Sequence, residues 1–368
     1  MRNRLTSAIL CLAFVGTAPL RAEERRPVRF AAPAGYHLLK CDFHMHTVFS
    51  DGRVWPTVRV DEAWREGLDA IAISDHLEVQ PFRQYVPTSR NAPQDLAAGR
   101  ASERNIILIR GAEITRPSPP GHHNAIFLWE IAPLDTKDYR DAFVAARQQN
   151  AFVFWNHPGR QGTGSSRWGE AQEELLRQKQ LHGVEICNGQ SYYEDAHRWA
   201  MERKLTLIGN SDAHEPTWGM AWTPARHRTL TLVFGRERTA EGIREALDAG
   251  RTVVWFQNQL IGYERNLLPV FDACVRISPV HHRTRDAAWF QIHNESELDL
   301  ELERLDQGAP PKILVASGLT ALVKVPTPNG VMPPTLPCRA ANFVVAPGQT
   351  LAVNLRIVEA APSANAAP

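Results

Sequence analysis

Short apolar runs recur along roughly the first 260 residues of the chain, and polar residues follow most of them. The runs span residues 37–43, 68–74, 105–112, 123–129, 151–155, 182–187 and 205–209. Helices are expected between some of them, at 57–67 and 138–149, where apolar residues are spaced among charged ones. Buried strands separated by helices predict an α/β fold in which a parallel sheet is covered on both sides.

Residue types that bind metals stand where these predicted strands end. His44, His76 and His157 each follow such a run, and Glu113 follows the run at 105–112. When a parallel sheet closes into a barrel, chemistry collects at the carboxyl ends of its strands. We therefore interpret the strand-end residues as members of one site.

Two motifs indicate how a metal could be chelated. His44 and His46 are two residues apart at the end of the first run, so both imidazoles can point to the same side of a strand. Asp212 and His214 repeat this spacing after the run at 205–209. A lone His-x-His pair is more often a bystander on a half-exposed strand, but its recurrence with other ligand types favours chelation.

The strand-end residues form one mixed set of imidazoles and carboxylates. They are His44, His46, Asp51, His76, Glu113, His122 or His123, His157, Asp212 and His214. About nine such groups are too many for one ion, so two or three metal ions bridged by carboxylate or hydroxide are expected.

The length of 368 residues favours two domains. The α/β pattern continues through a run at 229–235, a helix at 239–249 and a run at 250–256. From about residue 275 short alternating runs with Pro and Gly between them predict an antiparallel β-sandwich. The boundary is placed near 267–273, so the expected units are a lead-in at 23–35, an α/β domain at 36–266, a sandwich at 267–360 and a disordered tail at 361–368.

The first 22 residues are typical of a secretory signal peptide. Arg2 and Arg4 precede an apolar run at 8–15, and cleavage is expected after Ala22. A membrane anchor is the alternative, but the run is shorter than the ~20 residues that a spanning helix needs. We expect a periplasmic or secreted protein with no stable membrane span after cleavage.

Export would place the remaining cysteines in an oxidising space. They are Cys41, Cys187, Cys274 and Cys338. A bridge between Cys274 and Cys338 is expected, and four buried thiols are the alternative. The formal net charge of +1 argues against nucleic acid as a partner, because nucleic-acid binders carry a basic surplus.

Four motifs together resemble the PHP (polymerase and histidinol phosphatase) superfamily of metal-dependent phosphoesterases. They are HMHTVFSDG at 44–52, SDH at 74–76, NHP at 156–158 and SDAH at 211–214, with GAEIT between the second and third. The resemblance covers residues 36–262 and implies a distorted seven-stranded (β/α) barrel with a two- or three-metal site at the strand ends. Further stretches, such as PPGHHNAIF and FWNHPG, resemble a secreted branch that includes phosphodiesterases acting on small dialkyl (haloalkyl) phosphates.

The resemblance implies which positions bind metal. These are His44, His46, Asp51, His76, Glu113, His157, Asp212 and His214. GHHNAIF is similar to family members written Gly-His-x-Asn-Ala, which favours His122 over His123 as a further ligand. Mn²⁺ is the expected ion, with Zn²⁺ and Fe²⁺ as alternatives.

The ligand types suggest hydrolysis by a metal-bound hydroxide. Asp212 or Asp51 can orient the hydroxide, while His214, His76 or the spare histidine of the 122–123 pair can protonate the departing alkoxide. Arg160 and Arg110 are candidates for binding the substrate phosphate, because Arg makes bidentate contacts with phosphate. For both, a surface or salt-bridged arginine is the alternative.

The resulting expectation is a hydrolase that cleaves small phosphodiesters. The alternatives are a phosphatase for small monoesters and a non-catalytic binding protein that keeps its metals for stability. A small phosphate ester is the expected partner, and the sequence leaves the oligomeric state open. His182, His197 and His227 lie outside the strand ends and are expected on the surface.

Overall fold

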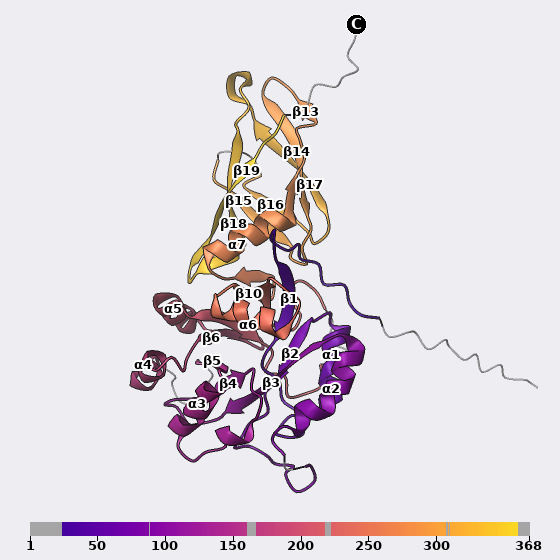
Figure 1. Ribbon diagram of the computed structural model, residues 1–368. Coiled ribbons are helices and arrows are strands. Elements are labelled where there is room, and N and C mark those ends of the chain that lie inside the picture. Colours follow the sequence, from indigo (N-terminus) through magenta and orange to yellow (C-terminus); the bar gives the residue numbers. More distant parts are fainter. Residues whose placement is uncertain are drawn as a thin grey trace, which may run out of the picture.

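The computed structural model describes residues 24–87, 89–159, 167–217, 222–306, 308 and 310–359. A wide α/β part is followed by a narrower part built of β-strands (Figure 1). The α/β class and the β-rich carboxyl-terminal domain predicted from the sequence are therefore confirmed. The predicted signal peptide at 1–22 and the tail at 361–368 lie outside the described residues.

Except for the short strands β7 and β11, which were not predicted, the strands of the α/β part follow the predicted apolar runs to within three residues at each end. They are β1 (His37–Asp42), β2 (Ala70–Ile73), β3 (Ile107–Ile114), β4 (His123–Ile126), β5 (Phe152–Trp155), β6 (Gly183–Asn188), β7 (Ser191–Tyr192), β8 (Thr206–Asn210), β9 (Leu230–Gly235), β10 (Thr252–Phe256) and β11 (Gln259–Ile261). Most of their residues are buried, which explains why apolar runs identified them.

The sheet is mixed, and the expectation of an all-parallel sheet is wrong. β1, β2 and β3 pair in parallel, as do β5, β6 and β8. β4 is antiparallel to both β3 and β5, and β9 is antiparallel to β1 and β10. β3 and β4 are linked by residues 115–122 alone, too few for the helical crossover that a parallel pair needs.

The two ends of this strand array meet at β8 and β9. No backbone ladder joins these two strands in the part of the chain that the structure describes. Instead, Thr231 Oγ1 of β9 donates to Gly209 O at 2.8 Å and accepts from Gly209 N at 3.0 Å. A Cβ at Gly209 would lie 2.2 Å from Val254 Cγ1, so glycine lets β8 pack directly on β10.

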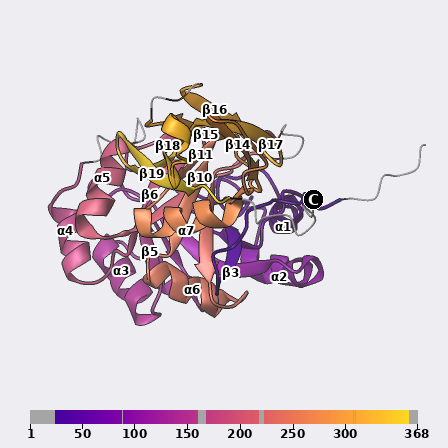
Figure 2. The ribbon, with the colours of Figure 1, turned by 90° about the horizontal axis from the view of Figure 1, so that it is seen from above.

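Helices surround the strands of the α/β part in the view from above (Figure 2). They are α1 (Pro56–Arg65), α2 (Ala92–Arg104), α3 (Tyr139–Gln148), α4 (Glu170–Arg177), α5 (Glu194–Arg203) and α6 (Ala240–Asp248), with the 3₁₀ helix η1 (Ala132–Leu134). α1 begins with Pro56 at its first position and ends before Gly67, whose φ is 82°. A Cβ at Gly67 would lie 2.5 Å from Arg26 O, so the lead-in can pass over this turn only because the residue is glycine.

The predicted boundary at 267–273 lies within a further helix, α7 (Glu264–Cys274). Leu267, Val270 and Phe271 of α7 are buried, so the helix packs on its neighbours although it contains Pro269. The structure thus has a packed helix at the position where the sequence analysis placed the domain boundary.

The carboxyl-terminal part consists of alternating strands in two antiparallel sheets. Its elements are β12 (Val275–Ile277), β13 (His282–Arg283), β14 (Ala287–Asn294), β15 (Leu300–Arg304), β16 (Lys312–Val315), β17 (Thr320–Pro326), η2 (Pro328–Gly330), β18 (Thr335–Ala346) and β19 (Gln349–Arg356). β18 pairs in parallel with β11 of the α/β part, so one sheet runs from one part into the other.

The expected bridge between Cys274 and Cys338 is not formed. Cys41, Cys187, Cys274 and Cys338 are all free and buried in the described structure. Cys274 Sγ instead lies 3.9 Å from Ala31 O of the lead-in. Burial raises the pKa of both Cys274 and Cys338 to about 11, so both thiols stay protonated near neutral pH.

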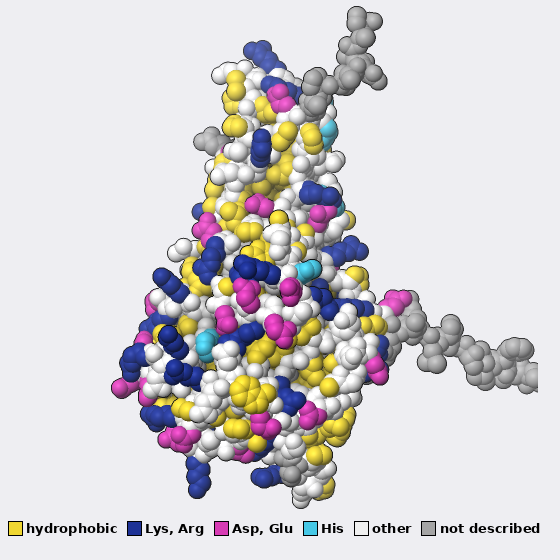
Figure 3. All heavy atoms as spheres, in the orientation of Figure 1, with side chains coloured by type: hydrophobic (Ala, Val, Ile, Leu, Met, Phe, Trp, Pro, Cys, Tyr) yellow, Lys and Arg dark blue, Asp and Glu magenta, His cyan; other side chains and the backbone are white. Residues whose placement is uncertain are grey.

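The outer surface carries charges of both signs. Lys and Arg side chains are interspersed with Asp and Glu over the face shown in Figure 3. Among the described residues, no helix combines the length and the apolar character that crossing a bilayer requires.

Candidate metal centre

The ligand candidates predicted from the sequence converge at the carboxyl ends of the strands. Their side chains form four overlapping groups whose ligand atoms lie within 4.8 Å of one another. The groups are His46–Asp51–His76–His214, His44–His157–Asp212, His44–His46–Glu113 and His76–Glu113–His122. The structure therefore brings together all nine residues of the predicted ligand set, with His122 as the member taken from the 122–123 pair.

Backbone contacts between strand ends create this convergence. Met45 bridges to Ala213, and His76 bridges to Glu113, each in parallel register. His46 N donates to Ala213 O at 3.0 Å, which places the two chelating motifs side by side. Asp212 adopts a positive φ of 53°, an uncommon conformation for a residue other than glycine and one that is found more often at functional sites.

Arg59 of α1 links the same two segments through hydrogen bonds to their backbone oxygens. Its Nε donates to His46 O at 2.9 Å, and its Nη2 donates to Ala213 O at 2.9 Å and His214 O at 2.8 Å. Arg59 is fully buried and pairs with Glu62. This role could not be predicted from local sequence patterns, because Arg59 and Ala213 are 154 residues apart in the chain.

Glu113 lies at the centre of the cluster and faces two groups at once. Its Oε2 lies 3.0 Å from His44 Nε2 and 3.3 Å from His46 Nε2. Its Oε1 lies 2.9 Å from His122 Nδ1 and 3.7 Å from His157 Nε2. A carboxylate with each oxygen directed to a different set of imidazoles can bridge two metal ions.

The orientation of the imidazoles fits metal binding. His44 Nδ1 lies 3.0 Å from Glu185 Oε1, and His214 Nδ1 lies 2.9 Å from the carbonyl oxygen of Asp212. These oxygens accept hydrogen bonds, so each Nδ1 carries the hydrogen and, in a neutral ring, Nε2 presents a free lone pair to the cluster.

A shielded carboxylate oxygen faces the lone pair of His214. Asp51 Oδ1 lies 3.2 Å from His214 Nε2 and 3.5 Å from His76 Nε2 without a well-directed hydrogen bond to either. Acceptor atoms that face one another at such distances need positive charge between them. The donor set thus fits divalent cations.

The pKa values of the cluster also show that its carboxylates stabilise positive charge nearby. Burial alone would lower the pKa of His44, but the carboxylates of Asp212, Glu185 and Glu113 raise it well above its usual range. Burial would raise the pKa of Asp51, but His214 and His76 lower it to about 2. The carboxylates of the cluster are therefore ionised near neutral pH, as ligands must be.

Glu185 of β6 supports two ligands and was missed by the sequence analysis. Besides His44 Nδ1, its carboxylate accepts from His157 N at 2.8 Å, Asn188 Nδ2 at 2.9 Å and Asn210 Nδ2 at 2.9 Å. A buried carboxylate with all its partners satisfied orients the ligands that it contacts. A charged residue inside the apolar run at 182–187 was the available signal.

We expect Glu185→Gln to weaken metal binding about 10- to 100-fold, because both oxygens of the carboxylate accept hydrogen bonds and the amide keeps only one accepting oxygen. Titration of metal-free protein with Mn²⁺, followed by calorimetry, measures this. Glu194→Gln is the matched control, since Glu194 is exposed and pairs with Arg198. Equal affinity of Glu185→Gln and the unmodified protein would show that Glu185 does not support the ligands.

Other predicted residues lie elsewhere. Arg160 is outside the described residues. Arg110 points away to Asp95 at 2.6 Å, which supports the alternative of a salt-bridged arginine. His123 is buried against Phe143 and Trp155, and burial lowers its pKa to about 3.

The expectation of surface positions is wrong for His197 and His227. Both side chains are buried, His197 against Tyr192 and His227 against Trp255. Neither lies at a strand end, so distance from the strand ends did not imply exposure.

Comparison with known proteins extends this picture. Residues 275–356 match a family model described as an Ig-like domain. The chain is similar to a solved two-domain protein of Bacteroides vulgatus that contains a predicted PHP-like metal-dependent phosphoesterase. The two are 40% identical, the match covers 91% of this chain and 100% of the other, and the TM-score is 0.87.

A second match is shorter. An uncharacterised protein of Methanocaldococcus jannaschii is 35% identical over 81 residues, or 22% of this chain. The match spans 36% of that curated relative, about a third of its length.

Proposed function

The chain belongs to the PHP-like metal-dependent phosphoesterases, and from this premise we propose that it hydrolyses small phosphodiesters at the metal cluster. The observation that carries the proposal is the position of Glu113, whose two oxygens face different imidazole groups of one cluster. Such an arrangement supports more than one ion at the site of reaction. A stably bound single ion would not need the shared carboxylate.

The residues that would hold the ions are the nine of the cluster. Two or three divalent ions would supply positive charge for the phosphoryl oxygens and lower the pKa of nearby water. We propose Mn²⁺, with Zn²⁺ or Fe²⁺ as alternatives, because mixed carboxylate and imidazole ligands suit these ions.

Protein groups can handle the protons of the reaction. The water oxygen attacks phosphorus, its proton passes to a carboxylate, and the phosphorus–oxygen bond to the alkyl group breaks. Burial would raise the pKa of Asp212, but His44 and His46 hold it well below its usual range, so its carboxylate is available to orient the water. For protonation of the departing alkoxide we propose His214, whose side chain is 28% exposed at the edge of the cluster, in the state in which its Nε2 carries a proton and binds no ion.

The exposure of the cluster is confined to a few side chains. Asp51, His214 and His122 have side chains 35%, 28% and 19% exposed, whereas those of His44, His46 and Glu113 are fully buried. A small substrate could reach the ions at these exposed groups. We propose a dialkyl phosphate of the haloalkyl type, which the resemblance to the secreted branch suggests.

Four further proposals complete the assignment. The sequence pattern of residues 1–22 supports export to the periplasm or outside the cell. The approach of Gly209 to Thr231 and Val254 supports a distorted seven-stranded barrel. The domain limits at 36–266 and 267–360 are likewise proposals, as is Arg160 as a phosphate-binding residue.

The test compares two substrates with added Mn²⁺. We expect faster hydrolysis of bis(p-nitrophenyl) phosphate than of p-nitrophenyl phosphate. Faster hydrolysis of the monoester would contradict the diester preference and favour a phosphatase. If the protein retains metal but turns over neither compound, a metal-stabilised binding protein becomes the better account.

A further inference from the structure

We propose that Asp75 is a positioning residue for one part of the metal cluster, the His46–Asp51–His76–His214 group. It holds the turn at residues 47–50 and thereby fixes the free nitrogen of His46 and the place of Asp51. The inference rests on the proposed function, because it concerns the same ions. Asp75 was not among the predicted ligands, although it stands next to His76.

Three hydrogen bonds tie the turn to Asp75 at the end of β2. Asp75 Oδ1 accepts from Thr47 N at 2.6 Å and from Ser50 Oγ at 2.7 Å. Asp75 Oδ2 accepts from Thr47 Oγ1 at 2.7 Å. Since Asp51 directly follows Ser50, these bonds determine where the Asp51 carboxylate enters the cluster.

The bond from Ser50 also decides the tautomer of His46. A serine hydroxyl has one hydrogen, and Ser50 Oγ donates it to Asp75. At His46 Nδ1, 3.4 Å away, the same oxygen can then only accept. Nδ1 therefore carries the hydrogen of a neutral His46, and Nε2 presents its lone pair toward Glu113 and Asp212.

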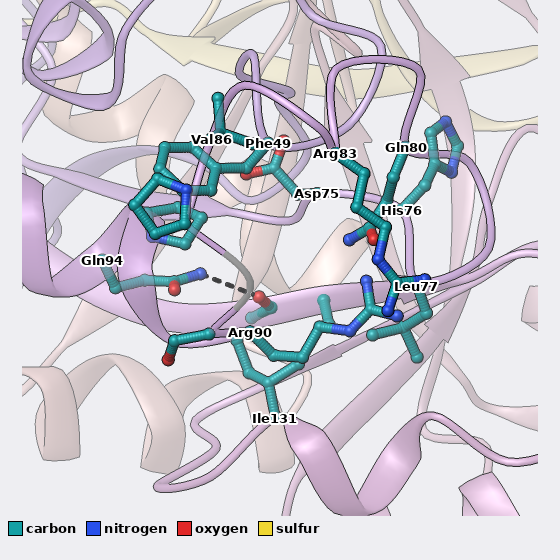
Figure 4. Close-up of a pocket in the computed structure, with 15 residues that line it drawn as sticks. Phe49, Asp75, His76, Leu77, Gln80, Arg83, Val86, Arg90, Gln94 and Ile131 are labelled. Carbon is teal, nitrogen blue, oxygen red and sulfur yellow. Dashed lines mark hydrogen bonds between the residues drawn. The ribbon is translucent and has the colours of Figure 1, made fainter.

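The surroundings of Asp75 favour a role through its neighbours, because both of its carboxylate oxygens already accept hydrogen bonds from the turn. Asp75 is 8% exposed, and it lines a cavity of about 20 Å³ with Phe49, His76 and Gln94 (Figure 4). Such a cavity has room for about one water molecule. Asp75 must therefore act through the groups that it holds.

The first test is Asp75→Asn. An asparagine offers one oxygen where three donors now converge, so the turn loses at least one bond. We expect the His46–Asp51–His76–His214 group to bind its ion about 10- to 100-fold more weakly, while the remaining ions are retained. Elemental analysis after dialysis against limiting Mn²⁺ measures the number of ions per chain.

Ser50 provides a second test that disturbs the fold less. Ser50→Ala removes the acceptor for His46 Nδ1 and should weaken the same ion about 10-fold, whereas Ser50→Thr keeps the hydroxyl and should bind as the unmodified protein does. The visible spectrum of Co²⁺-loaded protein should change in Ser50→Ala but not in Ser50→Thr, which a general loss of stability would not produce. Asp95→Asn, at an exposed ion pair with Arg110, controls for the change in charge.

The outcomes separate this inference from the proposed function. If the unmodified protein binds no ion, the proposed function fails. If it binds ions, and Asp75→Asn and Ser50→Ala bind the same number with the same affinity, only the role of Asp75 is overturned. Should Asp75→Asn not fold, the comparison of Ser50→Ala with Ser50→Thr decides.

Discussion

Asp212→Asn is expected to lower kcat/KM for the phosphodiester on the order of 10³-fold, the range seen when a charge-stabilising group is lost from an active site. Asp212 Oδ1 lies 3.2 Å from His44 Nε2 and 3.1 Å from His46 Nε2, so it faces imidazoles of more than one ligand group. The neutral amide keeps the shape of the side chain but loses the negative charge. Steady-state rates with bis(p-nitrophenyl) phosphate and added Mn²⁺ measure the effect.

The matched control for this variant is Asp195→Asn. Asp195 is the second residue of α5, forms an exposed ion pair with Arg198 and is in none of the ligand groups, so the rate of this variant should stay unchanged. Circular dichroism should show that the β-strands of the carboxyl-terminal part remain folded in Asp212→Asn. Full activity of Asp212→Asn would show that this carboxylate is neither a ligand nor a proton acceptor.

Removal of metal should abolish turnover and destabilise the protein. An ion present at 1,000 times its dissociation constant stabilises the folded state by about 4 kcal/mol. For a domain of this size that corresponds to a fall in Tm of about 10 °C on chelation. The physical reason is charge repulsion. Without the cations, the negative charges of Glu113, Asp212 and Asp51 would lie close together in the folded state with less positive charge to balance them.

Calorimetric scans with EDTA, and again after Mn²⁺ is restored, measure this effect. Activity and Tm should recover together. In Asp212→Asn the shift caused by EDTA should be smaller, because one shared ligand is already gone. An unchanged Tm and an unchanged rate in EDTA would mean that the cluster holds no exchangeable ion that contributes to stability or activity.

Much of the metal centre could be predicted because its ligands follow apolar strands. His44, His76 and His157 were found by this position alone, and a closed or nearly closed sheet brings strand ends together. The choice of His122 over His123 came from resemblance. The structure gives the physical reason, because His123 packs between Phe143 and Trp155.

The supporting residues could not be predicted in the same way. Glu185 contacts His44, which lies 141 residues away in the sequence, and Arg59 reaches residues beyond position 210. Such contacts depend on how strands are arranged, and local patterns carry no information about that. Asp75 lay within a recognised motif, but its role appears only from three bonds to the turn at 47–50.

The strands of the α/β part were predicted best, because most of them are wholly buried and read as apolar runs. The helices have mixed faces, and of these α1, α3 and α6 were predicted whereas α2, α4 and α5 were not. The antiparallel placement of β4 depends on the short connection from β3, which strand periodicity does not encode. The predicted bridge between Cys274 and Cys338 was wrong, because neither an oxidising compartment nor the number of cysteines determines which thiols lie close enough to pair.

The most direct test is anomalous X-ray diffraction from crystals grown with Mn²⁺, recorded at the manganese absorption edge. We predict two or three anomalous peaks among the nine ligand residues, with one peak on each side of the Glu113 carboxylate. A well-ordered crystal with no peak in this cluster, or with a single peak that Glu113 does not contact, would contradict the account.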